Sequence, residues 1–434
     1  MSFFSSSSFD VFRFRDFAIL SLNQFCLIFA ILILEITIGY TLYQISKNPL
    51  TLGFIALAEL CPFILLSFFG GYFADHFNKQ TILKWGFSLC CPIPLLFIFL
   101  FWCRQQQYID YSLFLAGIYV LIFFLGILRG IYSPSFNALR AFVVPEKYYS
   151  SANTWTAFFW QIGAIVAPML AGLLLEVCGL YLTLLLSFAL YFLGSIVLVF
   201  LQNRKFPSIP QQHVVQSLKE AWLFIFEKRI IFWSVLLDLS SVLFGGVLAL
   251  LTIFAQDIFK TGAQGLGLLR AAPAIGTCLM MLYLIKHPPI FHIWRNMLLA
   301  IGGFSICTIL FALSRQLWVS VLLLVLMGAF DSISMIIRQT LFQSIPPKNL
   351  LGRISALNGI LVTSGNQLGA LQSSLFTRWL GIIPATLISG CFCLGITLYS
   401  FSRTRDLFDY RLNKENQPFS KIRNPACHHN HTVK

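Results

Sequence analysis

A small set of ionisable side chains lies within long apolar stretches of this sequence, where a charge is costly. The candidate acids are Glu35, Glu59, Asp238 and Asp331, and the candidate base is Arg129. Two further bases, Arg270 and Arg338, also lie within such stretches, and we expect Arg270 to extend to the membrane surface. Inside a bilayer each costs about 2.5–3.5 kcal/mol on insertion scales. A carboxylate that is removed from water binds a proton more readily, so such a group can load and release a proton near neutral pH. We therefore take these residues as candidates for binding a proton or recognising a polar ligand.

Polar neighbours extend these positions into stripes. Gln24 precedes Glu35 by eleven residues, or three helical turns, so the two share a helix face. We place Glu35 first as the proton-coupling or cation-binding residue, and Asp331 or Asp238 next. The alternative for each acid is a packing or ion-pair role. Arg129 either belongs to the site or extends along its helix to the membrane surface.

The composition shows what kind of chain must position these residues. Of its 434 residues, 11% are charged and 58% are hydrophobic, against about 25% and 45–50% in ordinary soluble domains. This excludes a soluble enzyme, a disordered chain and a coiled coil. No Walker A sequence, Gly-x-Ser-x-Gly turn or metalloprotease motif is present, so we expect no ATP hydrolysis, no enzyme activity and no cofactor. The net charge of +14 fits one side of a bilayer better than it fits nucleic acid.

Hydropathy predicts an all-α integral membrane protein with twelve transmembrane helices. A bilayer core needs about 20 apolar residues per helix, and a barrel would instead show short alternating segments. The fifth and eleventh stretches are the least hydrophobic. The predicted spans are 17–44, 50–73, 82–102, 111–137, 151–175, 178–201, 230–254, 264–285, 297–314, 317–341, 353–377 and 380–402.

The distribution of Lys and Arg predicts that both termini are cytoplasmic. With this orientation most of the 30 basic residues lie in cytoplasmic segments or at the adjoining helix ends, as the positive-inside rule requires. The first apolar stretch is too long for a cleaved signal and should remain as the first helix. Five basic residues fall on the other side, namely Lys47, Arg104, Lys260, Arg315 and Arg378.

The longest polar interval, residues 202–229, divides the spans six and six. We expect an N-terminal segment (1–16), a six-helix bundle (17–201), a central loop, a second bundle (230–402) and a basic tail (403–434). The segment 217–226 is amphipathic enough for a helix on the inner surface. A weak repeat supports two pseudo-symmetric halves: Gln161-Ile162-Gly163-Ala164 recurs as Gln367-Leu368-Gly369-Ala370 in the eleventh span.

The loop after the second span carries the sequence Gly70-Gly71-Tyr72-Phe73-Ala74-Asp75-His76-Phe77-Asn78-Lys79-Gln80. It resembles the loop signature Gly-x-Leu-Ala-Asp-Arg-x-Gly-Arg-Lys of the major facilitator superfamily, although His76, Asn78 and Gln80 depart from it. The resemblance implies that Gly71, Asp75 and Lys79 form a latch for the outward-open state. The expected partners are Arg353, at the start of span eleven, and Arg129 or Arg140 on span four. Otherwise the segment is a short solvated turn.

A second resemblance is densest over residues 12–175. The segments FRFRDF, YTLYQISKNPLTLGFIALAEL and SANTWTAFFWQIGAIVAPMLAG are similar to the branch of that superfamily that contains the enterobactin exporter and the macrolide efflux proteins. The last segment also resembles the antiporter motif Gly-x-x-x-Gly-Pro-x-x-Gly-Gly. It keeps Gly163, Pro168 and Gly172, which would allow close helix packing and a kink. Ala167 and Ala171 replace two of the glycines.

The resemblance implies a monomeric transporter in the bacterial inner membrane that works by alternating access. Proton-coupled export of a small amphipathic molecule, a drug or a siderophore, is the expected function. Import of a siderophore or nutrient is one alternative. A non-transporting receptor or assembly subunit on the same fold is another.

Metal binding is a separate question, raised by the tail sequence Cys427-His428-His429-Asn430-His431. Such a tract can bind a transition metal, but a flexible polar tail is the simpler interpretation. Cys90-Cys91 and Cys391-x-Cys393 have no suitable zinc partners and fit small apolar packing residues. We therefore expect no resident metal, and the basic tail also suits anionic lipid headgroups.

Overall fold

The computed structural model describes residues 10–76, 78–202, 214–287, 292–347 and 350–408. In this part of the chain, eleven helices are long and apolar enough to cross a membrane. A twelfth helix, α15 (Leu351–Leu380), is long enough to cross a membrane. It is less apolar than the other eleven, because it carries many amide and hydroxyl side chains. It lies against α3, α10 and α16. The fold is therefore all-α, with twelve transmembrane helices in two six-helix bundles, as the hydropathy predicts.

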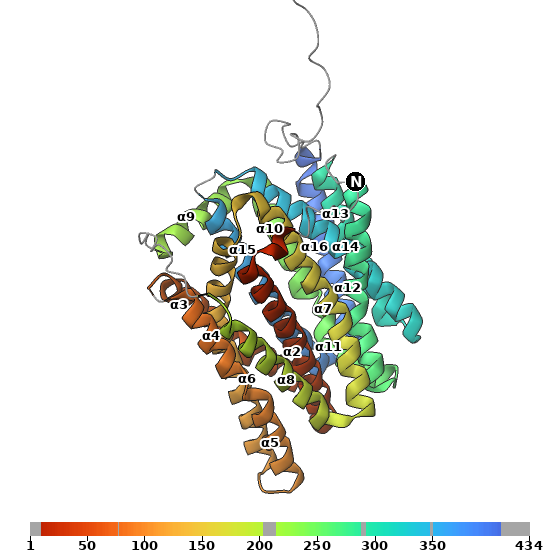
Figure 1. Cartoon of the computed structure of the whole chain (residues 1–434). Helices are drawn as coiled ribbons and strands as arrows, with labels where there is room; N and C mark the ends of the chain where they lie inside the picture. The colour runs from red at the N-terminus through yellow and green to blue at the C-terminus, as the bar shows by residue number, and fades with distance from the viewer. Residues whose placement is uncertain (1–9, 77, 203–213, 288–291, 348–349, 409–434) are drawn as a thin grey trace, which may run out of the picture.

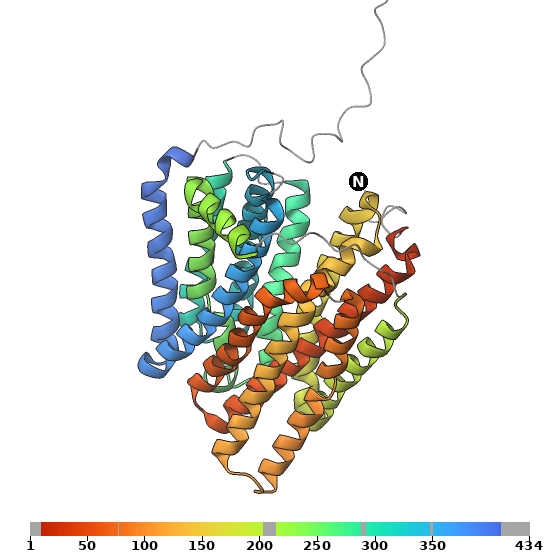
Figure 2. The same ribbon diagram turned by 90° about the vertical axis from the view of Figure 1, so that its left-hand side faces the viewer.

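The first bundle packs around one apolar cluster and the second around another. A third cluster joins α2, α3 and α7 to α11, α12 and α14 and so holds the two bundles together. Figure 2 shows the bundles side by side. The N-terminal bundle consists of η1 (Asp10–Arg13), α2 (Arg15–Ser46), α3 (Pro49–His76), α4 (Lys79–Cys90), α5 (Ile93–Gln105), α6 (Tyr111–Val143), η2 (Glu146–Tyr148), α7 (Tyr149–Val177) and α8 (Gly179–Val199).

The C-terminal part begins with α9 (Val214–Glu227), which covers the segment where the amphipathic pattern predicts a helix. Figure 1 shows α9 at the end of the molecule where α2 begins. The remaining elements are α10 (Arg229–Phe244), α11 (Val247–Ile253), η3 (Phe254–Ile258), α12 (Gly262–Lys286), α13 (Ile293–Leu313), α14 (Leu317–Ser344), α15, α16 (Ile382–Arg403) and η4 (Arg405–Leu407).

Two spans that we expected to be continuous are interrupted. The third consists of α4 and α5, which separate at Cys91-Pro92 because proline has no N–H to donate to the preceding turn. The seventh consists of α10, α11 and η3, with the break at Gly245-Gly246. A Cβ at Gly246 would lie 2.5 Å from the carbonyl oxygen of Gly369. Glycine at this position therefore lets α15 approach the broken helix.

An even number of spans brings the start of α2 and the end of α16 to the same end of the bundle, which we call the termini end (Figure 2). The opposite end, where α2 ends and α12 begins, is called the distal end. The tail tract considered for metal binding, Cys427 and His428 to His431, lies outside the described residues. Among the residues described, no group of three or more His, Cys, Asp or Glu side chains could hold a metal ion.

Candidate functional site

A cavity of about 750 Å³ lies between the two bundles. Its lining residues come mainly from the termini half of α2, α6, α7, α12 and α14, so the cavity opens toward the termini end. Most of its wall is apolar and includes the indole of Trp160. Such a wall, with a few polar groups, suits an amphipathic small molecule.

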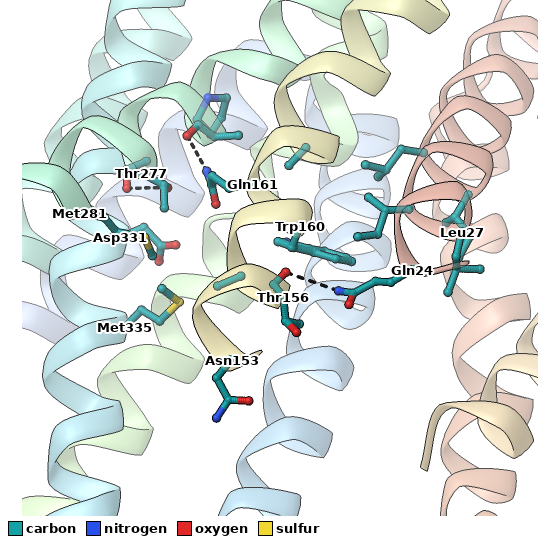
Figure 3. Close-up of a pocket in the computed structure, with 18 of the residues that line it drawn as sticks. Gln24, Leu27, Asn153, Thr156, Trp160, Gln161, Thr277, Met281, Asp331 and Met335 are labelled. Carbon is teal, nitrogen blue, oxygen red and sulfur yellow. Dashed lines mark hydrogen bonds between the residues drawn. The ribbon is translucent and has the colours of Figure 1, made fainter. Parts of the chain in front are cut away.

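Asp331 is the one acid among the described residues that line this cavity. No ion pair or hydrogen bond joins its carboxylate to another described residue. Figure 3 shows it on one wall with Met281 and Met335. The bases of the lining are Arg129 and Arg140. Of the predicted acids, Asp331 is thus the one that faces the cavity without a described partner.

The other wall carries amides and an aromatic ring. Gln24 Nε2 donates to the backbone carbonyl oxygen of Thr156 at 3.4 Å. Gln161 Nε2 donates to the carbonyl oxygen of Ala274 at 2.5 Å and so crosses from the first bundle to the second. Figure 3 shows both contacts, with Trp160 near Gln24. Hydrogen-bonding groups therefore lie on both sides of the space that a ligand would occupy.

Glu59 and Arg129, two of the predicted candidates, form an ion pair with 2.5 Å between Arg129 Nη1 and Glu59 Oε1. Gln367 of α15 also donates to Glu59, with 3.3 Å between Nε2 and Oε2. The alternative in which Arg129 extends to the membrane surface is therefore not what the structure shows. Its guanidinium instead neutralises an acid of the same bundle.

Glu35 lies away from Gln24 despite sharing its helix face. Eleven residues correspond to about 16 Å along a helix, so Gln24 lines the cavity while Glu35 lies nearer the distal end. There Arg270 of the second bundle contacts Glu35, with 3.2 Å between Nη1 and Oε1. Nothing in the sequence pairs these two residues, and extension of Arg270 to the membrane surface is not what the structure shows. The geometry instead makes it part of a contact between the bundles.

Further polar contacts close the distal end between the bundles. Tyr43 donates a hydrogen bond to Asp257. Lys47 Nζ lies 3.1 Å from Gln256 Oε1 and 3.5 Å from Asp257 Oδ1. The backbone N–H of Gln264 donates to Glu176 at 3.1 Å. We call these contacts, together with the Glu35–Arg270 pair, the distal closure.

Asp238, another predicted candidate, does not line the cavity. It forms an ion pair with Arg338, and the two side chains are only 6% and 7% exposed. This pair joins α10 to α14 within the second bundle. The ion-pair alternative describes this acid better than the ligand-binding one.

Small residues on α7 allow close helix contacts. A Cβ at Gly163 would collide with Ile28 of α2, and one at Gly172 would collide with the carbonyl oxygen of Ala263 in α12. Pro168 lies within the same helix, and its carbonyl oxygen would be 2.5 Å from a Cβ on Gly267. Gly163 therefore packs within the first bundle, whereas Gly172 packs against the second bundle at the distal end.

Replacing Gly172 with valine is expected to open the distal closure, because the added side chain collides with backbone that cannot rotate away. Lys47 should then react several-fold faster with a membrane-impermeant amine reagent, measured by mass spectrometry. Gly395→Val is the matched control, since nothing lies within 4 Å of a Cβ at Gly395. Equal labelling of Lys47 in the two variants would contradict the expectation.

The predicted latch lies largely beyond the described side chains. This applies to Gly71, Asp75 and Arg353, of which the structure describes only the helical backbone. Lys79 is buried at the start of α4, and Arg140 lines the cavity. The latch therefore remains a prediction.

The geometry described so far defines a class of protein. Two six-helix bundles that contact each other at one end and enclose a cavity open to the other are the architecture of an alternating-access transporter. Residues 20–370 match the family model of the Major Facilitator Superfamily. The chain belongs to this family and is a multi-pass membrane transporter.

The individual proteins that are similar to this chain share only a small part of its sequence. The Enterobactin exporter EntS of Shigella flexneri is 25% identical over 307 residues, which cover 69% of this chain and 70% of the relative. A solved bacterial homologue of the iron transporter ferroportin, in its inward-facing state, has a TM-score of 0.68 at 17% identity and covers 89% of this chain and 98% of its own. A POT family transporter in complex with 5-aminolevulinic acid has a TM-score of 0.71 at 13% identity, with 91% and 96% covered. These two structures support the fold.

Proposed function

We propose that this protein is a proton-coupled exporter of a small amphipathic molecule, a siderophore or a drug, in the bacterial inner membrane. The observation that carries the proposal is the cavity between the bundles, with its apolar wall and the unpaired carboxylate of Asp331. Similarity to an enterobactin exporter supports the siderophore class. The exporter would act as a single chain.

Orientation decides which compartment the cavity faces. The Lys and Arg distribution supports an orientation with the termini end toward the cytoplasm. The cavity opens toward this end. In this state a molecule from the cytoplasm would enter, and the distal closure would have to open for its release.

Purified protein in liposomes with an imposed pH gradient tests the proposal. The probes are a radiolabelled iron-free catecholate siderophore and a lipophilic fluorescent cation. An antiporter accumulates its substrate in liposomes that are acidic inside, because protons leave as the substrate enters. Accumulation only when the outside is acidic would identify a symporter and overturn the export proposal. Absence of gradient-dependent uptake of either probe, with the protein shown to be folded, would overturn the proposed function for these substrate classes.

Loss of the gradient through a protonophore is the matched control. It should abolish accumulation without changing binding. Secretion profiling of a strain that lacks the gene, under iron limitation and under drug challenge, then identifies the natural substrate.

A further inference from the structure

An apolar groove of about 530 Å³ runs along the exposed face of α16, the last spanning helix. Figure 2 shows α16, drawn in blue, at the outer edge of the second bundle. The groove follows the helix from Leu387 to Tyr399, and the side chains of Cys391 and Phe392 in its middle are exposed. Its occupant must therefore come from the membrane or from another molecule.

The length and the lining of the groove match one leaflet of a bilayer. Leu387 and Tyr399 are twelve residues apart, which corresponds to about 18 Å along a helix. Half of the hydrocarbon core of a bilayer is about 15 Å thick. Along this length the lining is apolar except for the thiol of Cys391 and the hydroxyl of Tyr399. The acyl chain of a phospholipid therefore fits the groove in both length and chemistry.

Basic side chains gather at the termini end of the groove. The guanidinium of Arg403 lies over the ring of Tyr399, with 5.9 Å between Cζ and the ring centroid. Arg403 is exposed, and so is Arg405 two residues later. Arg229 of α10 donates to the backbone carbonyl oxygen of Arg403 at 2.7 Å and so brings a third guanidinium to this place. We call Arg229, Arg403 and Arg405 the basic cluster.

The basic cluster carries more positive charge than the neighbouring acid neutralises. Asp406 pairs with Arg229, with 2.7 Å between Oδ2 and Nη1. Neither Arg403 nor Arg405 forms an ion pair with another described residue. Guanidinium groups bind phosphate oxygens through charge-assisted hydrogen bonds. An anionic phospholipid would place its phosphate beside these two arginines while its acyl chain lies in the groove.

Aromatic contacts between α10 and α16 form a border of the groove. The rings of Phe392 and Phe244 are stacked, with 5.5 Å between centroids. Tyr399 contacts Trp233 of α10, with 6.2 Å between centroids. Tyr and Trp side chains prefer the level of the headgroups in a bilayer, which is the level at which the basic cluster would meet a phosphate. The groove and the cluster are thus positioned by the same two helices.

A second copy of this chain is the alternative occupant, because spanning helices also pack through such faces. Two copies in one membrane that met through α16 around a two-fold axis would bring Arg403 and Arg405 of both chains close together. These like charges would repel each other, and α16 itself contains no acid that could compensate them. The charge at the end of the groove therefore favours an anionic lipid.

We propose that the groove of α16 and the basic cluster form a binding site for one anionic phospholipid of the leaflet at the termini end. Its acyl chain lies along α16 from Tyr399 toward Leu387, and its phosphate is bound by Arg403 and Arg405. The site is separate from the cavity between the bundles. It depends neither on the direction of transport nor on the coupling ion.

Native mass spectrometry of the full-length, delipidated protein in detergent micelles tests this inference. The protein is titrated separately with phosphatidylglycerol and with phosphatidylcholine that carry identical acyl chains, and the affinity for the first bound lipid is measured. We expect phosphatidylglycerol to bind about tenfold more tightly, because its net negative charge meets the basic cluster. Equal affinities would overturn the inference.

Charge variants locate the headgroup. Arg403→Gln/Arg405→Gln should lower the affinity for phosphatidylglycerol to nearly that for phosphatidylcholine. Arg13→Gln/Arg15→Gln is the matched control, because it removes two exposed arginines at the same end of the first bundle. The control should keep the preference. If the two double variants behave alike, the preference comes from overall charge or from another place, and the inference is wrong.

A variant that fills the groove locates the acyl chain. Cys391→Phe leaves the basic cluster intact and should lower the affinity for phosphatidylglycerol about fivefold, since less apolar surface of the lipid is buried. Cys61→Phe is the matched control, because Cys61 is an exposed cysteine within a spanning helix of the first bundle. Unchanged binding by Cys391→Phe would contradict the inference.

Two further outcomes of the same experiment would assign the surface to another ligand. Glycerol phosphate in large excess should not displace phosphatidylglycerol; if it does, the arginines form a site for free phosphate and no acyl chain is needed. A dimer that forms without lipid and is lost in Cys391→Phe would give the groove to a second copy. Either result would overturn the inference. Since no transport is measured, the outcome is independent of the proposed function.

Discussion

Asp331→Asn is expected to lower gradient-driven uptake of the transported probe about tenfold or more, which corresponds to about 1.4 kcal/mol or more of lost interaction. The carboxylate faces the cavity and has no described partner. Asparagine has nearly the same shape, so the variant removes a charge without opening a cavity. Uptake by the variant in acidic-inside liposomes, compared with wild type at equal protein, measures the effect.

Asp406→Asn is the matched control for this charge change. Asp406 and Arg229 form an exposed ion pair at the termini end, with 2.7 Å between Oδ2 and Nη1. Exposed pairs contribute about 1 kcal/mol or less, so the variant should transport like wild type. If Asp331→Asn also transports at the wild-type rate, then Asp331 does not recognise the substrate. If both variants lose transport, the cause is general charge or stability.

Hydropathy and charge predicted the fold well because a bilayer imposes strict limits on segment length and backbone hydrogen bonding. The two interrupted spans were missed because proline and glycine leave the apolar pattern intact while changing the helix locally. Pro92 and the Gly245-Gly246 pair were visible in the sequence. The sequence alone does not show that the backbone of Gly369 lies close to Gly246. This close contact is the reason why position 246 requires glycine.

The candidate site was predicted only in part. Composition singled out the four acids within the apolar segments, since charges there are rare. Their partners depend on how helices from the two bundles face each other, which periodicity within one helix cannot provide. Glu35 and Arg270 are 235 residues apart, and their 3.2 Å contact forms only when the bundles meet.

The internal repeat carried more information than its four letters suggested. It predicted two related halves, but it did not reveal that its glutamines cross between them. The acceptors, a carbonyl at Ala274 and a carboxylate at Glu59, lie on helices outside the repeat. Near-identical sequences can therefore have different chemistry in the two halves, because each contact is completed by a residue that differs.

Breaking the buried Asp238–Arg338 pair is expected to lower the free energy of unfolding by about 3–5 kcal/mol. Either Asp238→Asn or Arg338→Met leaves its partner buried and uncompensated among side chains that are almost fully enclosed. Arg338 Nε already has no described hydrogen-bond acceptor, so the guanidinium cannot easily find another partner. Unfolding in mixed micelles with increasing SDS measures the loss.

The double variant Asp238→Leu/Arg338→Met separates an unpaired charge from a loss of packing. Apolar residues of similar volume often replace a buried ion pair at little cost, because removing both charges also removes their desolvation penalty. The double variant should therefore be more stable than either single variant and should transport substrate, since neither residue lines the cavity. Asp406→Asn should change stability by about 1 kcal/mol or less. A stable double variant without transport would instead give Asp238 a functional role, because a purely structural pair is dispensable once both charges are gone.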